Sequence, residues 1–240
     1  MSKFFYKLAK VVMAGSFAVA MLLPSSVSAQ EGKIVRGAQL YDKWFAVIKA
    51  EKPKETHPAW PAANTKKSGN TTWRCKSCHG WDYMGTDGAY KSGSYNTGIK
   101  GINAMAGADT AKIIAIMKDD THKLSGLMDD ADFQDLALFV SKGQVDMSKF
   151  IDYEKKVATG GDAARGKDYY ETACAQCHGI KGDLPKDMDK TLAKQLGNPW
   201  EVVHKILNGQ PAEQMPALRV FDHQITLDLM AHMATLPIEK

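Results

Sequence analysis

The sequence lacks any apolar run long enough to cross a membrane. The longest mainly apolar stretch, residues 11–23, has 13 residues, whereas a membrane-spanning helix needs about 20. Three lysines precede this stretch, and the small residues Val27, Ser28 and Ala29 close it. The layout predicts a secretory signal peptide at residues 1–29 with cleavage after Ala29; retention as an N-terminal anchor is the alternative. We therefore expect an exported protein with no transmembrane segment in its mature part.

The chain also lacks a large excess of charge of one sign. The predicted signal contains three of the 31 Lys and Arg residues and none of the 27 Asp and Glu residues, so the formal charge falls from +4 to +1 without it. A protein that binds nucleic acid would need a much larger basic excess, so this class is excluded. A hydrophobic content of 44% and a charged content of 24% exclude a disordered or collagen-like chain.

Cysteine is scarce, and all four cysteines fall into two short motifs. These are CKSCH at residues 75–79 and CAQCH at residues 174–178, the attachment signature of c-type haem. Two thiols three positions apart add to the two vinyl groups of one haem, and the adjacent histidine then lies under the ring as the proximal iron ligand. We therefore expect two haem c groups, attached at Cys75, Cys78, Cys174 and Cys177, with His79 and His178 as the proximal ligands.

Other uses of paired cysteines fit less well. Export would ordinarily suggest disulfides. A zinc ribbon places its two C-x-x-C pairs about 15–20 residues apart, whereas Cys78 and Cys174 are much further apart. A thioredoxin-like redox pair needs alternating strands and helices, and neither motif lies in such a pattern.

The helix signals occur twice in the same order, and we expect no strands. Each half has one helix before its motif, one after it and one near its end, with polar caps or Arg-Gly pairs marking the starts. In the first half these helices start at Arg36, Thr110 and Asp129 or Asp130, and in the second at Arg165, Asn198 and Asp222. The first half's last helix is expected to run to Gly143, and the polar residues 148–161 to form a linker. The chain is thus predicted to be a divergent tandem repeat.

On these motifs and this order, the sequence resembles a diheme member of the class I cytochrome c superfamily. The resemblance covers residues 30–240 in outline and is best over residues 166–236. It implies an all-α periplasmic protein with two tandem cytochrome c-like helical haem domains, residues 30–147 and 162–240, joined by residues 148–161. It also implies redox partner proteins that donate and accept electrons.

The resemblance implies a sixth iron ligand in each domain. In the second domain, Met215 lies after the motif and before the last helix, where this family usually places a methionine ligand. A thioether suits haem iron and raises its reduction potential. The competing methionines are Met188, Met230 and Met233, of which the last two fall within the final helix.

The first domain departs from this pattern. Matching Leu136 to Leu229 in the two last helices gives an offset of 93 residues, which carries Met215 onto His122. We expect His122 to be the sixth ligand. Met128 remains the alternative, although it lies next to the helix cap, and Met105, Met117 or an open site fit less well.

The first domain also carries about 30 extra residues between its first helix and Cys75. The glycines Gly37 and Gly166 are 129 residues apart, whereas the first motif cysteines are 99 apart. This insertion contains the basic residues Lys52, Lys54, Lys66 and Lys67. Two further basic residues, Arg74 and Lys76, flank Cys75. Either these residues form a docking surface for an acidic redox partner, or the insertion is a solvated loop over a haem edge.

A haem with both axial positions filled has no vacant site for a substrate. The leading hypothesis is therefore a periplasmic diheme cytochrome c that transfers single electrons between redox partners and has no catalytic residues. The alternatives are a diheme oxidoreductase of the thiosulfate dehydrogenase type and the haem subunit of a periplasmic dehydrogenase. An unusual sixth ligand in the first domain is compatible with the oxidoreductase, although no cysteine is left over to serve as that ligand.

Overall fold

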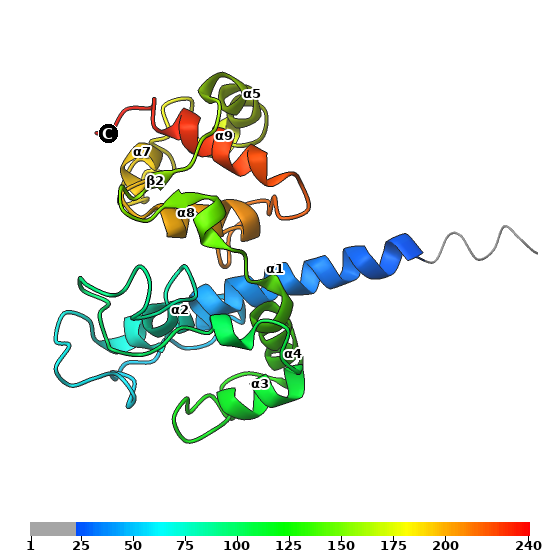
Figure 1. Ribbon diagram of the computed structural model, residues 1–240, viewed down its shortest axis with the longest axis vertical. Helices are drawn as coiled ribbons and strands as arrows, with labels where there is room; N and C mark the ends of the chain where they lie inside the picture. The colour runs from blue at the N-terminus through cyan, green and yellow to red at the C-terminus, as the bar shows by residue number, and fades with distance from the viewer. Residues whose placement is uncertain (1–22) are drawn as a thin grey trace, which may run out of the picture.

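The chain is mainly helical, as the sequence predicts (Figure 1). The computed structural model describes residues 23–240, so most of the predicted signal peptide, residues 1–29, lies outside the described residues. No helix in the described range is long and apolar enough to cross a membrane. Elements α1 to α4 lie together in the lower part of Figure 1 and elements α5 to α9 in the upper part.

The elements follow one another along the chain in this order. The α-helices are α1 (Leu23–Val47), α2 (Cys75–His79), α3 (Thr110–Met117), α4 (Asp130–Leu138), α5 (Ala163–Ala173), α6 (Ala175–His178), α7 (Leu192–Gln195), α8 (Pro199–Asn208) and α9 (His223–Met233). Short 3-10 turns are η1 (Gly69–Trp73), η2 (Asn103–Met105) and η4 (Met147–Lys149), and η3 (Phe139–Gly143) is a π-helical turn that continues α4. The strands are β1 (Ile151–Asp152) and β2 (Val157–Ala158).

Two predictions of secondary structure are wrong: where the first helix begins, and the absence of strands. Helix α1 begins at Leu23, well before Arg36, with Pro24 in its first turn, where proline is tolerated. The backbone leaves the helical region at Lys43 (φ −156°, ψ 74°), which divides the helix. Strands β1 and β2 form an antiparallel hairpin inside residues 148–161, where no strand was expected. Ile151 is buried there, and β-branched residues such as Ile151 and Val157 fit a strand.

The predicted helix caps are largely confirmed. Asp129 accepts from the Asp132 backbone N–H (2.8 Å), and Asp132 accepts in return from the Asp129 N–H (3.1 Å), which forms a capping box at α4. Asp222 accepts from the Gln224 N–H (2.8 Å) at α9. Asn198 precedes α8 as predicted, but its amide donates to the Glu201 carboxylate (2.8 Å) and does not cap a backbone N–H.

One helix crossing occurs twice. Gly37 of α1 lies so close to α4 that an added Cβ would overlap the Asp135 carbonyl oxygen, and Gly166 of α5 lies against the Asp228 carbonyl of α9 in the same way. The arginine before each glycine pairs with the aspartate at its crossing: Arg36 with Asp135 (2.9 Å) and Arg165 with Asp228 (2.9 Å). Asp135 and Asp228 are 93 residues apart, which is the offset between Leu136 and Leu229.

A tyrosine then ties each first helix to the haem motif that follows it. The Tyr41 hydroxyl donates to the Gly80 carbonyl (2.6 Å), and the Tyr170 hydroxyl donates to the Gly179 carbonyl (2.5 Å). Both acceptors directly follow the motif histidines. The crossing and the motif therefore form one frame in each half of the chain.

The two halves meet where α1 packs on α8. His204 of α8 is buried there, with Nε2 3.1 Å from the Ala38 carbonyl and its ring 4.9 Å from that of Trp81. Gln39 donates to the Asn208 carbonyl across the same seam (2.8 Å). Residues of both halves contribute to one hydrophobic core around it.

We predict that Gly166→Ala destabilises the protein because two backbones are already in contact and neither can move aside. Overpacking costs about 1–3 kcal/mol, and the upper end is expected here. Gly197→Ala is the control, since its Cβ would only meet the Lys194 carbonyl at 3.4 Å. Urea unfolding of both variants measures the difference, and equal stabilities would contradict the crossing.

Candidate haem-binding sites

Both haem motifs lie on short helices that end in a sharp turn. Cys75 begins α2, and Cys174 caps α6. Each helix ends at its histidine, and the glycine that follows has a positive φ, 84° at Gly80 and 71° at Gly179. Such a φ strongly favours glycine. The local sequence thus fixes where the chain turns away from each motif.

None of the four motif cysteines, all within the described residues, forms a disulfide. Burial raises the pKa of both Cys75 and Cys78 to about 12, so both carry their protons at neutral pH. Burial also raises the pKa of Cys174.

Each motif histidine is oriented by a backbone carbonyl. His79 Nδ1 lies 2.8 Å from the Lys100 oxygen, and His178 Nδ1 lies 3.1 Å from the Leu184 oxygen. A carbonyl only accepts, so Nδ1 carries the hydrogen in both rings and Nε2 keeps its lone pair for a metal. Burial lowers the pKa of His79, which favours the neutral ring that an iron requires. Both residues therefore fit the proximal position.

The structure brings His122 opposite His79. Their ring centroids are 6.3 Å apart, and the ring planes meet at 27°. A metal–imidazole nitrogen bond is about 2.0 Å long and the nitrogen lies about 1 Å from the ring centre, so two imidazoles on one metal have centroids about 6 Å apart. The observed separation fits an iron between the two rings.

Asp119 orients the second ring, a role that the sequence analysis missed. Its Oδ1 accepts from the backbone N–H groups of Thr121 (2.9 Å) and His122 (2.8 Å), and lies 3.0 Å from His122 Nδ1. These bonds lower the pKa of Asp119, with the two from His122 foremost. The carboxylate thus accepts a hydrogen bond from His122 Nδ1–H and leaves Nε2 free, which makes the imidazole a stronger ligand. An Asp three residues before a His was a local signal that could have revealed it.

The competing methionines are placed by packing. Met117, Met128, Met230 and Met233 are all buried in the hydrophobic core to which both halves contribute. Met105 and Met188 are half-buried, the first in the turn η2 and the second in the loop after α6. Met215 is half-buried in the loop between α8 and α9, and its carbonyl packs against Gly209, which ends α8.

A buried charge cluster holds the first motif against the second half. The Asp42 carboxylate of α1 pairs with Arg74, which directly precedes Cys75, and with Lys205 of α8. Arg74 Nε also donates to the Asp42 carbonyl (2.7 Å). Burial alone would raise the pKa of Asp42, but Lys205 and Arg74 outweigh it and hold that pKa well below its usual range.

The basic residues next to Cys75 are therefore not a docking surface. Arg74 is engaged by Asp42, and Lys76 is only 3% exposed, with its ammonium 4.9 Å from the Trp81 ring centre and 4.4 Å from that of Tyr95. Lys52, Lys54 and Lys66 remain exposed. The part of the docking hypothesis that rests on Arg74 and Lys76 is wrong.

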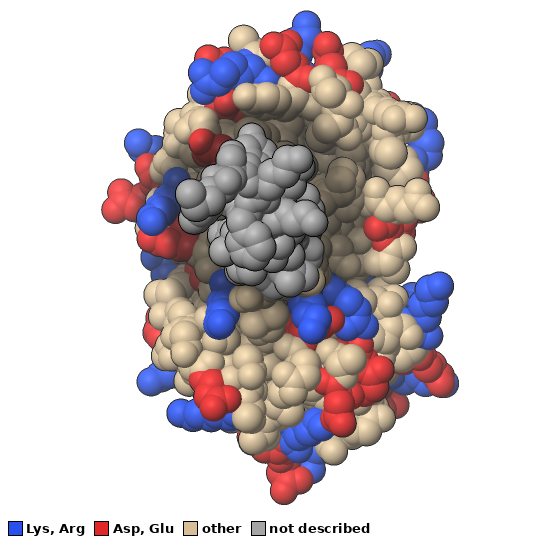
Figure 2. Space-filling model, turned by 90° about the vertical axis from the view of Figure 1, so that its right-hand side faces the viewer, with Lys and Arg blue, Asp and Glu red and all other residues tan. Residues whose placement is uncertain are grey.

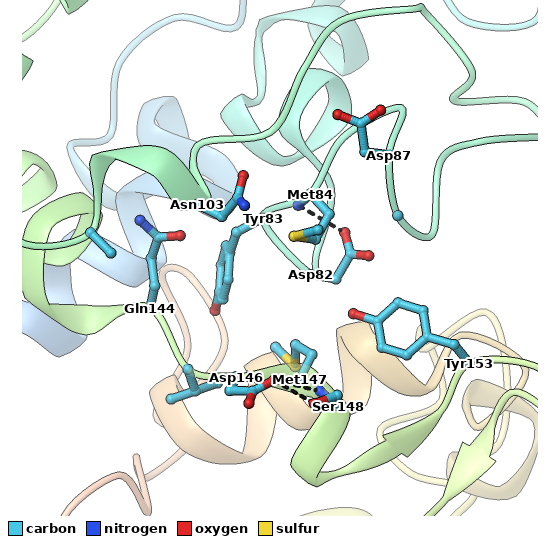
Figure 3. A pocket seen from close by; sticks show the side chains of 13 residues that line it. Asp82, Tyr83, Met84, Asp87, Asn103, Gln144, Asp146, Met147, Ser148 and Tyr153 are labelled. Atoms are coloured by element: carbon cyan, nitrogen blue, oxygen red, sulfur yellow. Dashed lines mark hydrogen bonds between the residues drawn. The ribbon is translucent and has the colours of Figure 1, made fainter.

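A cavity of about 590 Å³ lies beside the loop that follows the first motif (Figure 3). Its lining includes the carboxylates of Asp82, Asp87 and Asp146. Figure 3 shows the Tyr153 hydroxyl turned toward Asp82, whose pKa is raised by burial. None of the predicted haem-binding or axial residues lines this cavity.

Comparison with known proteins finds one similarity, around the second motif. Residues 161–230 match the family model for cytochrome C oxidase, cbb3-type, subunit III. No curated protein and no solved structure matches the chain. The matched residues run from before α5 into α9 and include the motif at residues 174–178. Over this region the chain is thus similar to a c-type cytochrome domain, a class that binds haem c covalently and transfers electrons to redox partners.

We predict that Asp42→Asn loses about 3 kcal/mol of unfolding free energy at pH 7, because two half-buried cations are left without their buried carboxylate. The folded pKa of Asp42 is depressed, so its contribution is complete above the ordinary value of 3.8 and is lost as the pH falls below it. Urea unfolding from neutral to acid pH should therefore bring wild type and variant together at low pH.

The control for this change is Asp120→Asn, whose partner Lys123 and carboxylate are both largely in solvent. It should leave stability nearly unchanged. An equal effect of the two substitutions would contradict the role of the buried cluster.

Proposed function

We propose that the chain is an exported, periplasmic diheme cytochrome c that transfers single electrons between redox partners. The observation that carries this proposal is the repeated orientation of the motif histidines, each with Nδ1 on a carbonyl and Nε2 free. Export rests on the signal-peptide layout of residues 1–29. All four cysteines of the chain lie in the two C-x-x-C-H motifs, so haem attachment would leave none to form a disulfide after export.

The repeated frame supports a second cytochrome c domain at residues 30–147, beside the one at residues 162–240 with residues 148–161 between them. Both halves share the glycine crossing, the Arg–Asp pair beside it and the tyrosine bond to the glycine after the motif. These contacts recur although the first half carries the insertion. In this proposal Cys75 and Cys78 hold one haem, and Cys174 and Cys177 hold the other.

The proposed axial pairs are His79 with His122, and His178 with Met215. The 6.3 Å between the ring centroids and the bond to Asp119 support His122, whereas Met128 is packed in the core. Met215 is supported by its place in the loop before α9 and by the burial of Met230 and Met233.

Bound haem c supplies one-electron oxidation and reduction of its iron. The chain's residues set the potential at which this happens. Met215 raises the potential of its site, whereas two imidazoles, one of them polarised by Asp119, favour a lower potential at the other site. The pair of sites therefore has a direction, in which electrons arrive on the His79 side and rest on the Met215 side.

The charges on this protein's surface do not indicate whether its partner is acidic or basic. Figure 2 shows basic and acidic side chains interspersed on the face that it presents. The exposed lysines of the insertion, Lys52, Lys54 and Lys66, would lie on the electron-entry side. A free carrier and a haem subunit of a dehydrogenase both fit this surface.

An oxidoreductase of the thiosulfate dehydrogenase type is the second candidate, favoured by the non-methionine ligand at the first site. The cavity beside the first motif is lined by three carboxylates, which would repel a sulfur oxyanion. Turnover of thiosulfate, tetrathionate or sulfite by the purified protein would identify it as an oxidoreductase. A slow or absent reaction would favour an electron-transfer protein.

We predict that the mature protein begins near Gln30 and carries two covalent haems. Intact mass spectrometry should find two haem additions on the cleaved chain. Replacing Cys174 and Cys177 by Ala should leave one haem, and Cys75→Ala with Cys78→Ala is the matched control that should retain the other. A disulfide within either motif would contradict the assignment.

We further predict two different low-spin haems. Redox titration with low-temperature EPR should find one bis-histidine signal at lower potential and one His/Met signal at higher potential. Met215→Ala should remove the sulfur-to-iron absorption band of the oxidised protein and lower the higher potential, whereas Met188→Ala should change neither.

Two outcomes would contradict the proposed ligands of the first haem. Two His/Met signals would exclude His122 and favour Met128. A high-spin signal at the first haem would reveal a vacant position and favour an enzyme.

A further inference from the structure

The insertion in the first half touches the loop that carries His122. His57, within the insertion, places its Nε2 2.9 Å from the His122 carbonyl oxygen. The two residues are 65 positions apart in the sequence. His57 is half-buried, so water competes less for this bond than at an exposed site. The contact joins two loops that no regular element connects.

The direction of this hydrogen bond is fixed by a second one. The Ala59 backbone N–H donates to His57 Nδ1 (3.1 Å), so Nδ1 is the acceptor nitrogen of that ring. The hydrogen therefore sits on Nε2 and points at the His122 carbonyl, which can only accept.

His57 is also anchored to the segment that enters the haem motif. Its backbone N–H donates to Thr72 Oγ1 (2.8 Å), and its ring packs edge-on against Trp73, with centroids 4.3 Å apart. The Trp44 indole of α1 donates to the Trp73 carbonyl (3.0 Å). Trp73 lies two residues before Cys75. One end of the insertion thus holds His57 firmly beside the attachment cysteines.

The His122 loop has little regular structure of its own. It follows α3, and the His122 side chain is 31% exposed while that of Asp119 is 43% exposed. Asp119 fixes how the His122 ring is turned, but it belongs to the same loop. The bond from His57 ties this loop to the motif side of the molecule.

We propose that His57 is a positioning residue for the distal ligand of the first haem, holding the His122 backbone so that its imidazole stays opposite His79. This inference rests on the proposed axial pair and gives the insertion a role other than partner docking. Without the bond, the loop should move away from the iron more often and admit an external ligand in place of His122.

The test compares three substitutions in the full-length protein with both haems. His57→Phe keeps a ring against Trp73 but has no donor, His57→Gln keeps an N–H donor at similar reach, and His57→Glu matches Gln in shape but only accepts. Cyanide binding to the oxidised protein measures how often His122 leaves the iron, while EPR and redox titration follow the first haem.

We expect His57→Phe and His57→Glu to accelerate cyanide binding at the first haem about 3- to 10-fold, the effect of losing one hydrogen bond. Both should also broaden the bis-histidine signal and shift its potential. His57→Gln should restore wild-type behaviour, and the Met215 haem should be unchanged in all three. His223→Phe, which alters a histidine packed on Phe150 far from this loop in sequence, is the control.

Wild-type cyanide kinetics in both the Phe and Glu variants would overturn the inference. Equal acceleration in Gln and Glu would also overturn it, because packing rather than donation would then be responsible. Absence of a bis-histidine signal from the wild-type protein would instead overturn the proposed axial pair, and this inference with it.

Discussion

The rest of the structure depends on one constraint, the close crossing of a first and a last helix at a glycine. The crossing fixes α1 against α4 and α5 against α9, and in each pair an arginine beside the glycine binds an aspartate across the crossing. The two helix backbones are in direct contact at each glycine, so neither the angle nor the distance between the helices can change much. The tyrosine one turn later then reaches the carbonyl after the motif histidine. The position of each motif follows from the crossing.

In the proposed haem sites, the same frame carries different chemistry on the distal side. In both halves a backbone carbonyl sets the proximal ring, so the motif histidines are equivalent. In the proposed distal positions an imidazole bound to Asp119 faces one ring, and a thioether is assigned to the other. Axial ligand identity is a main determinant of haem potential. A repeat with one fold can therefore hold two electrons at different energies.

Features of the fold that depend on neighbours in sequence could be predicted from it. Asp129 and Asp222 were predicted as caps because a cap needs only the next three residues. The offset of 93 residues followed from matching apolar positions in the last helices, and the Asp135–Asp228 pair carries the same offset in the structure. The start of α1 was predicted too late, because the Arg-Gly pair at residues 36–37 lies inside the helix and not at its beginning.

Contacts between distant residues could not be predicted in this way. Asp42, Arg74 and Lys205 come together from three separate segments, and each alone is an ordinary charged residue in the sequence. His57 gave no signal because its partner is a backbone carbonyl, which any residue possesses. Lys76 belonged to a basic run that suggests a surface, yet aromatic rings cover it.

The proposed ligands also explain why only the first half carries an insertion. A thioether has no second polar atom to satisfy, and the Met215 loop is held by its own backbone against Gly209 at the end of α8. An imidazole ligand has a second nitrogen that needs an acceptor, and Asp119 supplies it from an exposed loop. The side chains of His122 and Asp119 are 31% and 43% exposed, so packing alone holds this loop weakly. The insertion reaches this loop from the cysteine side and supplies a directed hydrogen bond where a buried core is lacking.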